Sequence, residues 1–259
     1  MSRRIRHRRK GWTPGVRSPD VDASVAVIAA LAIERAPLDV LIAADPQSSI
    51  HVYQSGPGHE RAYSAARSAI SAGASALVSW GVAGALVPEL SAGTILLPQQ
   101  VLTPAGVTLA TDLRWRMELY RALQPMFAVR DGSILETPDV LTTRAVKAQA
   151  AQASGAIAAD MESAAVGQAA SDAGKPFVVL RVVLDTLADT LPPGVERWID
   201  EAGNRRRMAA FEMALRPASW PNLIGLSRRY GRARGALAAS AQVLVPHGFL
   251  YSQPSSAQV

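Results

Sequence analysis

The strongest strand signal in the chain is Phe177-Val-Val-Leu-Arg-Val-Val-Leu-Asp185, a run of large apolar residues interrupted by one arginine. Such a run is typical of a strand that is buried on both faces of a sheet. Arg181 and Asp185 stand four positions apart, which places both side chains on the same face of the strand. Because a buried arginine is costly unless it is paired, this stretch predicts a central strand with a polar site at its end.

Strand and helix signals alternate on the N-terminal side of this stretch. Further strands are predicted at residues 25–31, 39–43, 50–53, 76–80, 93–97, 133–136 and 156–159. Helices are predicted at residues 58–72, 114–123, 142–153, 163–173 and, beyond the stretch, 195–215. This alternation predicts an α/β fold, a three-layer α/β/α sandwich with a mixed, mostly parallel twisted sheet.

The two ends of the chain differ from this body in composition. Residues 1–24 form a basic arm with scattered proline and glycine, which we expect to be disordered. Residues 25–216 make up the predicted α/β domain, and residues 217–259 a basic amphipathic extension. Within the extension, residues 223–245 carry four arginines among apolar residues. We favour a helix packed against the body over a helix that lies on a membrane surface.

Composition excludes several classes of protein. The formal charge is +6, but six basic residues lie within residues 3–10, and the remaining 21 basic residues equal the 21 acidic ones. A nucleic-acid-binding domain usually carries its charge on the fold, so none is expected. The absence of cysteine excludes disulfides and thiolate metal sites, and the four histidines lack metal-ligand spacing. No apolar run suits a signal peptide or a membrane span, so we expect a cytoplasmic, soluble protein without metal or cofactor.

Polar residues and glycines that follow strands are the candidates for a site, because ligands of open α/β sheets bind beyond the carboxyl ends of the strands. Gly56-Pro57-Gly58 precedes a helix, where it forms either an anion site or a plain turn. Residues 81–84, Gly-Val-Ala-Gly, either let the backbone pass close to a flat ligand or form a tight turn.

Four acidic residues and Arg181 allow two interpretations each. Asp160 and Glu162 precede a helix, where either carboxylate could cap the helix or could accept hydrogen bonds from a ribose. Arg181 and Asp185 form either a structural pair, with Glu34 as a further partner, or a proton donor with a neighbouring cation. We expect Asp189 to be an ordinary surface acid, as we do Asp200.

Four segments in this order resemble the superfamily of purine nucleoside phosphorylases and methylthioadenosine/S-adenosylhomocysteine nucleosidases. They are Glu34 after the first strand, Ser-Trp-Gly-Val-Ala-Gly-Ala-Leu at 79–86, Ala-Asp-Met-Glu-Ser at 159–163 and Val-Leu-Arg-Val-Val-Leu-Asp at 179–185. The resemblance covers roughly residues 25–215. The sequence Asp-Thr-Leu-Ala-Asp-Thr-Leu-Pro-Pro at 185–193 and the basic extension look most like the hopanoid-associated branch, whose members release adenine from adenosylhopane.

The resemblance implies a role for each matching residue. Asp185 would donate a proton to N7 of the adenine, which requires a pKa raised by burial. Glu34 and Arg181 would place a nucleophilic water. Glu162 would bind the ribose hydroxyls. The remaining substrate-binding positions are Met161 against the sugar, Val140 and Leu141 as one wall of the base pocket, Gly84 beneath the base, and its small or apolar neighbours Ala83 and Val82.

The resemblance leaves the nucleophile open. Val82 and Leu184 stand where many members have serine, and the phosphate-gripping arginine loop of the hexameric phosphorylases is missing after the first strand. Water is therefore favoured, and phosphate remains a possible co-substrate with Arg35, Arg61 or the 56–58 turn as contacts. The implied partners are a purine nucleoside, a second copy in a homodimer and a peripheral membrane contact. The alternatives are a nucleosidase or phosphorylase of nucleoside salvage, a nucleoside-binding protein on the same fold, and nucleic-acid binding through the basic arm.

Overall fold

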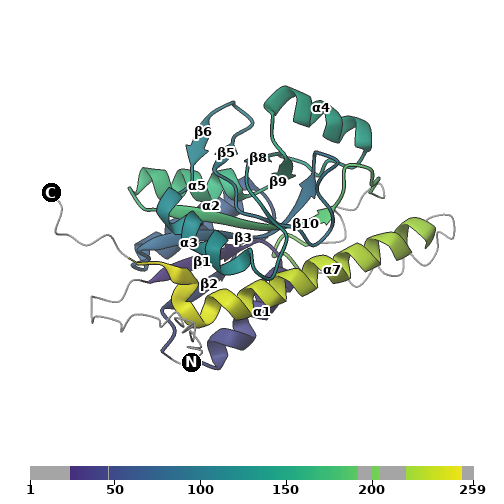
Figure 1. Ribbon diagram of the computed structural model, residues 1–259. Coiled ribbons are helices and arrows are strands. Elements are labelled where there is room, and N and C mark those ends of the chain that lie inside the picture. Colours follow the sequence, from purple (N-terminus) through teal and green to yellow (C-terminus); the bar gives the residue numbers. More distant parts are fainter. Residues whose placement is uncertain (1–23, 46, 192–199, 205–219, 253–259) are drawn as a thin grey trace, which may run out of the picture.

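A computed structural model describes residues 24–45, 47–191, 200–204 and 220–252 (Figure 1). Its ten strands are β1 Val25–Ala29, β2 Ile50–Gln54, β3 Ala76–Ala85, β4 Ile95–Leu96, β5 Gln100–Leu102, β6 Thr108–Ala110, β7 Val129–Arg130, β8 Ser133–Glu136, β9 Ala158–Asp160 and β10 Phe177–Asp185. Its helices are α1 Ala32–Ala43, α2 His59–Ser71, α3 Leu113–Leu123, α4 Arg144–Ser154, α5 Ser163–Asp172, α7 Trp220–Leu244 and the 3-10 helix η3 Val245–Leu250. The α/β fold predicted from the sequence is confirmed.

Strand β3 is the centre of the sheet. Its first half lies between β1 and β10, both parallel to it, and its end at residues 84–85 pairs antiparallel with β9. The main path runs β6-β5-β8-β9-β3-β10-β4-β7, with β1 and β2 branching from β3. Six of the nine pairings between described strands are parallel, as predicted.

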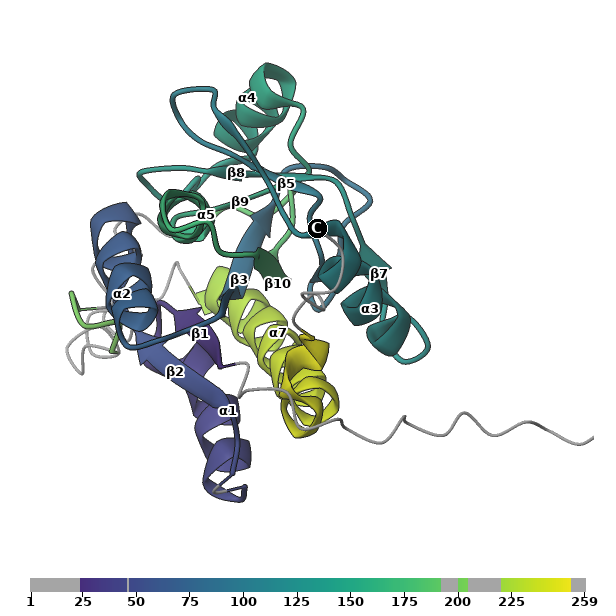
Figure 2. The ribbon, with the colours of Figure 1, turned by 90° about the vertical axis from the view of Figure 1, so that its left-hand side faces the viewer.

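Helices cover both faces of the sheet and make the expected three layers (Figure 1 and Figure 2). Alternate residues of β1 divide between the two cores: Val27 joins the core under α1, α3 and α7, and Ile28 joins the core under α2 and α5. Helix α4 lies at one end of the molecule, far from α1 in both views. No helix of the described residues is both long enough and apolar enough to cross a membrane.

The extension packs against the body, as we favoured. Helix α7 contacts β10 and α1, and its buried residues Ala233, Leu237, Ala241 and Leu244 lie in the same core as β1. Its arginines at 228, 232 and 234 are exposed. The apolar face of this helix is therefore used within the molecule.

Two predictions about local structure are wrong, and one alternative that the sequence left open is excluded. Residues 39–43 are the end of α1 and not a strand, because the helix continues through Pro37. A proline inside a helix removes one backbone hydrogen bond, and the burial of Leu38 in the core shared with β1 offsets that cost. Residues 81–84 belong to β3 and form no turn. Residues 200–204 form a turn, although a helix was predicted at 195–215; residues 195–199 and 205–215 lie outside the described residues.

Candidate active site

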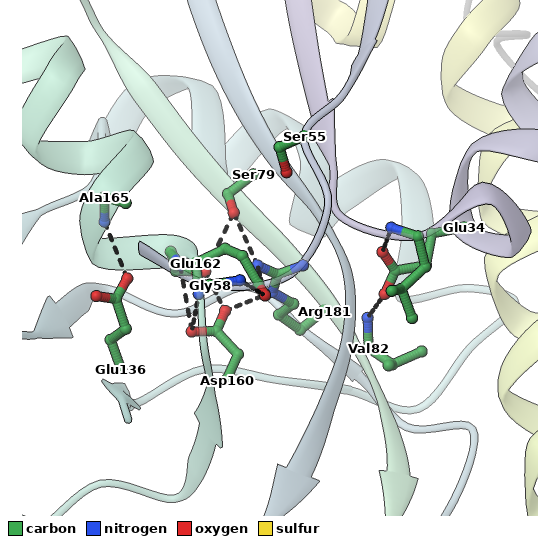
Figure 3. A network of polar contacts seen from close by, with 12 residues as sticks. Glu34, Ser55, Gly58, Ser79, Val82, Glu136, Asp160, Glu162, Ala165 and Arg181 are labelled. Carbon is green, nitrogen blue, oxygen red and sulfur yellow. Dashed lines mark hydrogen bonds and ion pairs between the residues drawn. The ribbon is translucent and has the colours of Figure 1, made fainter. Parts of the chain in front are cut away.

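Arg181 is the centre of a buried polar network at the carboxyl end of the sheet (Figure 3). It lies in the middle of β10, and 1% of it is exposed. Its Nε donates to Oδ2 of Asp160 at 2.5 Å, and its Nη2 donates to Oγ of Ser79 at 3.0 Å. Asp160 ends β9 and Ser79 belongs to β3, so three strands bring these groups together. The guanidinium is paired chiefly with Asp160, which is the partner a buried cation requires.

Glu34 joins the start of α1 to the central strand. Its Oε2 accepts the backbone N–H of Leu31 at 2.9 Å, and its Oε1 accepts that of Val82 at 2.9 Å. Burial raises the pKa of the Glu34 carboxyl, and the positive charge of Arg181 opposes this effect. The carboxyl group is thus fixed in place and binds a proton more readily than an exposed glutamate.

Glu162 does not cap helix α5 with its side chain, although it stands at the N-cap position of the helix. Asp160 does so instead, because its Oδ1 accepts the N–H of Ser163 at 3.2 Å. Glu162 reaches away from α5: its Oε1 accepts the N–H of Gly58 at 3.0 Å, and its Oε2 lies 3.6 Å from Nη2 of Arg181. The capping interpretation therefore holds for Asp160 and is wrong for Glu162.

The pKa of Glu162 is raised to about 8. Burial is the main cause, the charges of Asp160 and Glu34 add to it, and Arg181 opposes it. At Arg181 the neighbouring charges outweigh burial. Burial disfavours the charged form of the guanidinium, but Asp160, Glu162 and Glu34 together raise its pKa. One guanidinium is therefore shared among three carboxyl groups, two of which bind protons readily.

Each glycine of the 81–84 segment stands opposite a polar residue of β10. Gly81 pairs with Arg181, and Gly84 pairs with Asp185 across an irregularity in the ladder. A Cβ at Gly81 would lie 2.3 Å from Nη1 of Arg181 and 2.4 Å from Oε1 of Glu34. The groups that lie close to these glycines are the protein's own polar side chains, and the approach of a flat ligand stays a prediction.

Of the three guanidinium nitrogens of Arg181, Nη1 is the one without a hydrogen-bond partner among the described residues. It is buried, and the part of the chain that the structure describes supplies no hydrogen-bond acceptor for it. Nη1 of Arg181 and Oε1 of Glu34 both lie close to the same point beside Gly81. A hydrogen-bond donor and an acceptor are therefore near each other there. Buried donors are rarely left without a partner, so this atom is a candidate contact for a water molecule or a ligand.

Asp185 forms a second polar centre at the end of β10. Its Oδ2 contacts Nζ of Lys147, and both side chains are almost fully buried. Burial raises the pKa of the Asp185 carboxyl, and the Lys147 ammonium opposes this effect. A Cβ at Gly84 would lie 3.3 Å from Oδ2 and 3.4 Å from Oδ1, so the carboxyl group lies directly over this glycine.

The remaining predicted residues lie around these two centres without joining their polar contacts. Ala83 is buried in the core beneath α5, and Leu141 packs on a small cluster of Leu86, Ala156 and Ala159. Met161 and Val140 are half-buried. The roles of these residues against a base or a sugar stay predictions.

Several buried residues of the site could not be identified from the sequence. Lys147 lies among alanines and glutamines in a predicted surface helix, and a lone lysine there is ordinarily exposed. Asp189 is buried and not a surface acid, because Nη2 of Arg229 in α7 lies 2.6 Å from its Oδ1. Glu136 is also buried and contacts Nδ1 of His59 at 2.6 Å. Asp160, in contrast, was identified as a candidate from the sequence, because it stands in the Asp-Met-Glu segment.

The arrangement combines the groups that acid–base chemistry requires. Asp185 and Glu34 both have a raised pKa, and each lies at the carboxyl end of the sheet. The described residues contain no group of three acidic or histidine side chains arranged to hold a metal ion.

A profile of the phosphorylase superfamily matches residues 45–216 of the chain. No curated protein sequence matches it significantly. Among solved structures, an S-adenosylhomocysteine nucleosidase from Streptococcus pyogenes is 20% identical, with 92% of this chain and 100% of that chain covered and a TM-score of 0.66. Futalosine hydrolase of Helicobacter pylori is 16% identical, with 88% and 97% covered and a TM-score of 0.65. The 5′-methylthioadenosine/S-adenosylhomocysteine nucleosidase of Helicobacter pylori is 17% identical, with 86% and 99% covered and a TM-score of 0.63.

Proposed function

Since the chain belongs to the phosphorylase superfamily, we propose that it cleaves the N-ribosidic bond of an adenine nucleoside with water as the nucleophile. The observation that carries this proposal is the pair of atoms beside Gly81, the partnerless Nη1 of Arg181 and Oε1 of Glu34. A water molecule between them would donate to the carboxylate and accept from the guanidinium. The raised pKa of Glu34 suits it to take the proton that water loses as it attacks.

The charge around Arg181 favours water over phosphate. A phosphate dianion requires positive charge, but this guanidinium already lies beside the carboxyl groups of Asp160, Glu162 and Glu34. The ion pair with Asp160 already neutralises the guanidinium, so little positive charge is left for an added anion. A water molecule carries no charge and needs no such compensation.

The other phosphate contacts considered from the sequence are engaged elsewhere. Arg35 pairs with Asp39 at 2.9 Å, and Arg61 pairs with Glu201 at 3.1 Å. The N–H of Gly58 at the start of α2 binds the carboxylate of Glu162. The helix terminus that could hold an anion is therefore already occupied by a carboxyl group of the protein itself.

Asp185 and Glu162 supply the other two functions that the reaction needs. Cleavage of the bond leaves electrons on the purine and positive charge on the sugar. Asp185, whose pKa burial raises, would protonate the departing base. Glu162, with Oε2 3.6 Å from Arg181, would accept a hydrogen bond from a ribose hydroxyl and stabilise the positive sugar.

We extend the proposal to adenosylhopane as the substrate, in hopanoid biosynthesis. The support is the resemblance of residues 185–193 and of the basic extension to the hopanoid-associated branch. The similar solved structures are named as nucleosidases for methylthioadenosine and S-adenosylhomocysteine and as futalosine hydrolase, so smaller nucleosides are the alternative. We further propose a cytoplasmic homodimer.

A triterpenoid nucleoside partitions into membranes, so the proposal includes a contact with an anionic bilayer. The exposed arginines of α7 at 228, 232 and 234 and the basic arm would make this contact electrostatic, because the apolar face of α7 is buried. Sedimentation with anionic vesicles should therefore occur at low salt and weaken at high salt. A chain lacking residues 1–10 serves as the comparison, and no sedimentation of the full chain at low salt would contradict the contact.

One assay tests the proposed reaction. The protein is incubated with adenosine, methylthioadenosine or adenosylhopane, with and without phosphate, and the base and sugar products are identified. We expect adenine and a free sugar in both conditions, and a loss of about two to four orders of magnitude in turnover for Asp185→Asn. Asp39→Asn, an exposed aspartate, is the matched control. A sugar 1-phosphate would instead indicate a phosphorylase, and binding without adenine release would indicate a nucleoside-binding protein.

A further inference from the structure

Lys147 is the buried residue of helix α4. Its ammonium group contacts Oδ2 of Asp185 and donates to the backbone oxygens of Thr186 at 2.8 Å and Asp189 at 3.2 Å. An ammonium group has three N–H donors, so all three are used. The lysine is therefore held in a fixed position with one carboxylate and two carbonyl groups around it.

This burial is not explained by the packing of α4. Ala150 and Ala151 pack onto the cluster of Leu86, Ala156 and Ala159. This apolar contact attaches the helix to the body without any charged group. A buried ammonium costs free energy unless it is fully paired, and an apolar residue at this position would avoid that cost. The lysine is thus a candidate for a function that depends on its charge.

The three acceptors around Lys147, which are Oδ2 of Asp185 and the backbone oxygens of Thr186 and Asp189, form a cage. Its only carboxyl group belongs to the residue that we assigned as the acid. Lys147 contacts Oδ2, one of the two carboxyl oxygens of Asp185, and thereby fixes the rotation of the group over Gly84. The 186–191 segment and the 140–143 segment are also joined, because the N–H of Leu191 donates to the oxygen of Thr142 at 2.8 Å. The acid and the predicted wall of the base pocket are therefore part of one connected structure.

We propose that Lys147 is a positioning residue for proton transfer: it orients Asp185 through Oδ2 and stabilises the carboxylate that remains when Asp185 has given its proton to the purine. This inference rests on the proposed function. In the step, the O–H bond of Asp185 breaks and the proton binds the purine, while the electron pair of the bond between C1′ and the base stays on the base. Water oxygen binds C1′ and its proton goes to Glu34. Lys147 keeps all of its protons.

Two opposing effects on Asp185 define what Lys147 contributes. Burial, together with the nearby charge of Asp189, raises the pKa of Asp185, which keeps a proton available, and Lys147 lowers it, which makes that proton easier to give away. Removal of the ammonium should raise the pKa further and make the acid weaker. Activity that requires protonated Asp185 is lost as the pH rises through this pKa, so the alkaline limb of the pH profile should move to higher pH without Lys147.

The test compares Lys147→Met with the wild type on two substrates. Adenosine has a base that must be protonated, and 4-nitrophenyl riboside has a leaving group that departs without a proton. For Lys147→Met we expect kcat on adenosine to fall about tenfold to hundredfold and the alkaline limb of kcat/KM to move up by about one pH unit. Activity on 4-nitrophenyl riboside should stay within about threefold of the wild type, because no acid is needed.

Lys175→Met is the matched control, since Lys175 is half-buried and lies outside this cage. Should Lys147→Met fail to fold, Lys147→Gln keeps a donor for Oδ2 without the charge, and the same shift of the limb is expected. Equal losses on both substrates with an unmoved limb would overturn the inference and leave Lys147 a structural residue. A limb that moves to lower pH would also overturn it, because Lys147 itself would then be the proton donor. A wild type that cleaves neither substrate would overturn the proposed function, and this inference with it.

Discussion

The backbone N–H of Gly58 donates a hydrogen bond to Oε1 of Glu162 at 3.0 Å, which joins the start of α2 to the start of α5 across 104 positions of sequence. The first N–H groups of a helix have no partner within it and carry partial positive charge. Here one of them binds a buried carboxyl group. The bond orients Glu162 so that Oε2 lies on the side of Arg181. A sugar hydroxyl that binds Glu162 would therefore meet a carboxyl group already fixed in direction.

The first prediction concerns Glu162→Gln. The amide keeps the size of the side chain but cannot ionise and replaces one acceptor oxygen by a donor. Activity on adenosine should therefore fall about a hundredfold, while activity on 2′-deoxyadenosine, which lacks one hydroxyl, should fall much less. Steady-state kinetics on both substrates measure the difference. Glu89→Gln, at an exposed glutamate, is the control. A wild type that cleaves both substrates equally well would contradict hydroxyl recognition by Glu162.

The second prediction concerns stability against pH. The pKa of Glu162 is about 8 in the folded protein against an ordinary value of 4.5, so folding favours the protonated form. The stability from this group is fully present below pH 4.5 and is lost as the pH rises through about 8. The unfolding free energy in urea should therefore decrease from pH 5 to pH 9. In Glu162→Gln this decrease should be smaller, and an unchanged slope would show that the carboxyl group titrates normally.

The third prediction compares two glycines of β3. In Gly81→Ala the methyl group would lie within 2.4 Å of polar atoms of Arg181 and Glu34, both held by other bonds, so we expect a destabilisation of about 3 kcal/mol and no measurable activity. In Gly84→Ala the nearest atom is Oδ2 of Asp185 at 3.3 Å. This variant should fold nearly as well as the wild type, with reduced turnover. Urea unfolding and adenine release measure both, and equal stability of the two variants would contradict the crowding at Gly81.

How far the sequence predicts this molecule depends on whether a feature is local. The apolar runs of β1 and β10 appear in the sequence because burial on both faces requires them, and the order of strands and helices follows. Glu34, Glu162 and Arg181 were found because they follow or interrupt such runs, and the structure brings them together. Lys147 could not be found, because its burial depends on where α4 lies relative to β10 and not on its neighbours in sequence.

The same limit explains the errors. Residues 39–43 were predicted as a strand because they form a short, mostly apolar run before the turn at Asp45-Pro46, yet they end a helix that packs against α7. Asp189 read as a surface acid because nothing nearby in sequence pairs with it, whereas its partner Arg229 lies forty residues further along. Tertiary contacts decide such positions, and a single sequence does not display them.

The last prediction concerns that partner, because the ion pair between Arg229 and Asp189 connects the C-terminal helix to the acid. Oδ1 of Asp189 lies 2.6 Å from Nη2 of Arg229, and its Oδ2 accepts the N–H of Thr186 at 2.8 Å. The backbone oxygens of Thr186 and Asp189 are the two that hold Lys147. The ion pair between Arg229 and Asp189 therefore attaches the segment that carries these oxygens to α7.

In Arg229→Ala, Asp189 would keep its bond to Thr186 but lose its charged partner, and the cage around Lys147 should loosen. Because Arg229 is about one-third exposed, the cost in unfolding free energy should be modest, about 1 kcal/mol. Turnover on adenosine should fall several-fold more than this stability loss suggests, since the orientation of Asp185 depends on the cage. Arg228→Ala removes an exposed arginine one position away and should change neither quantity. If the two variants behave alike in adenine release, α7 covers the core without positioning the acid.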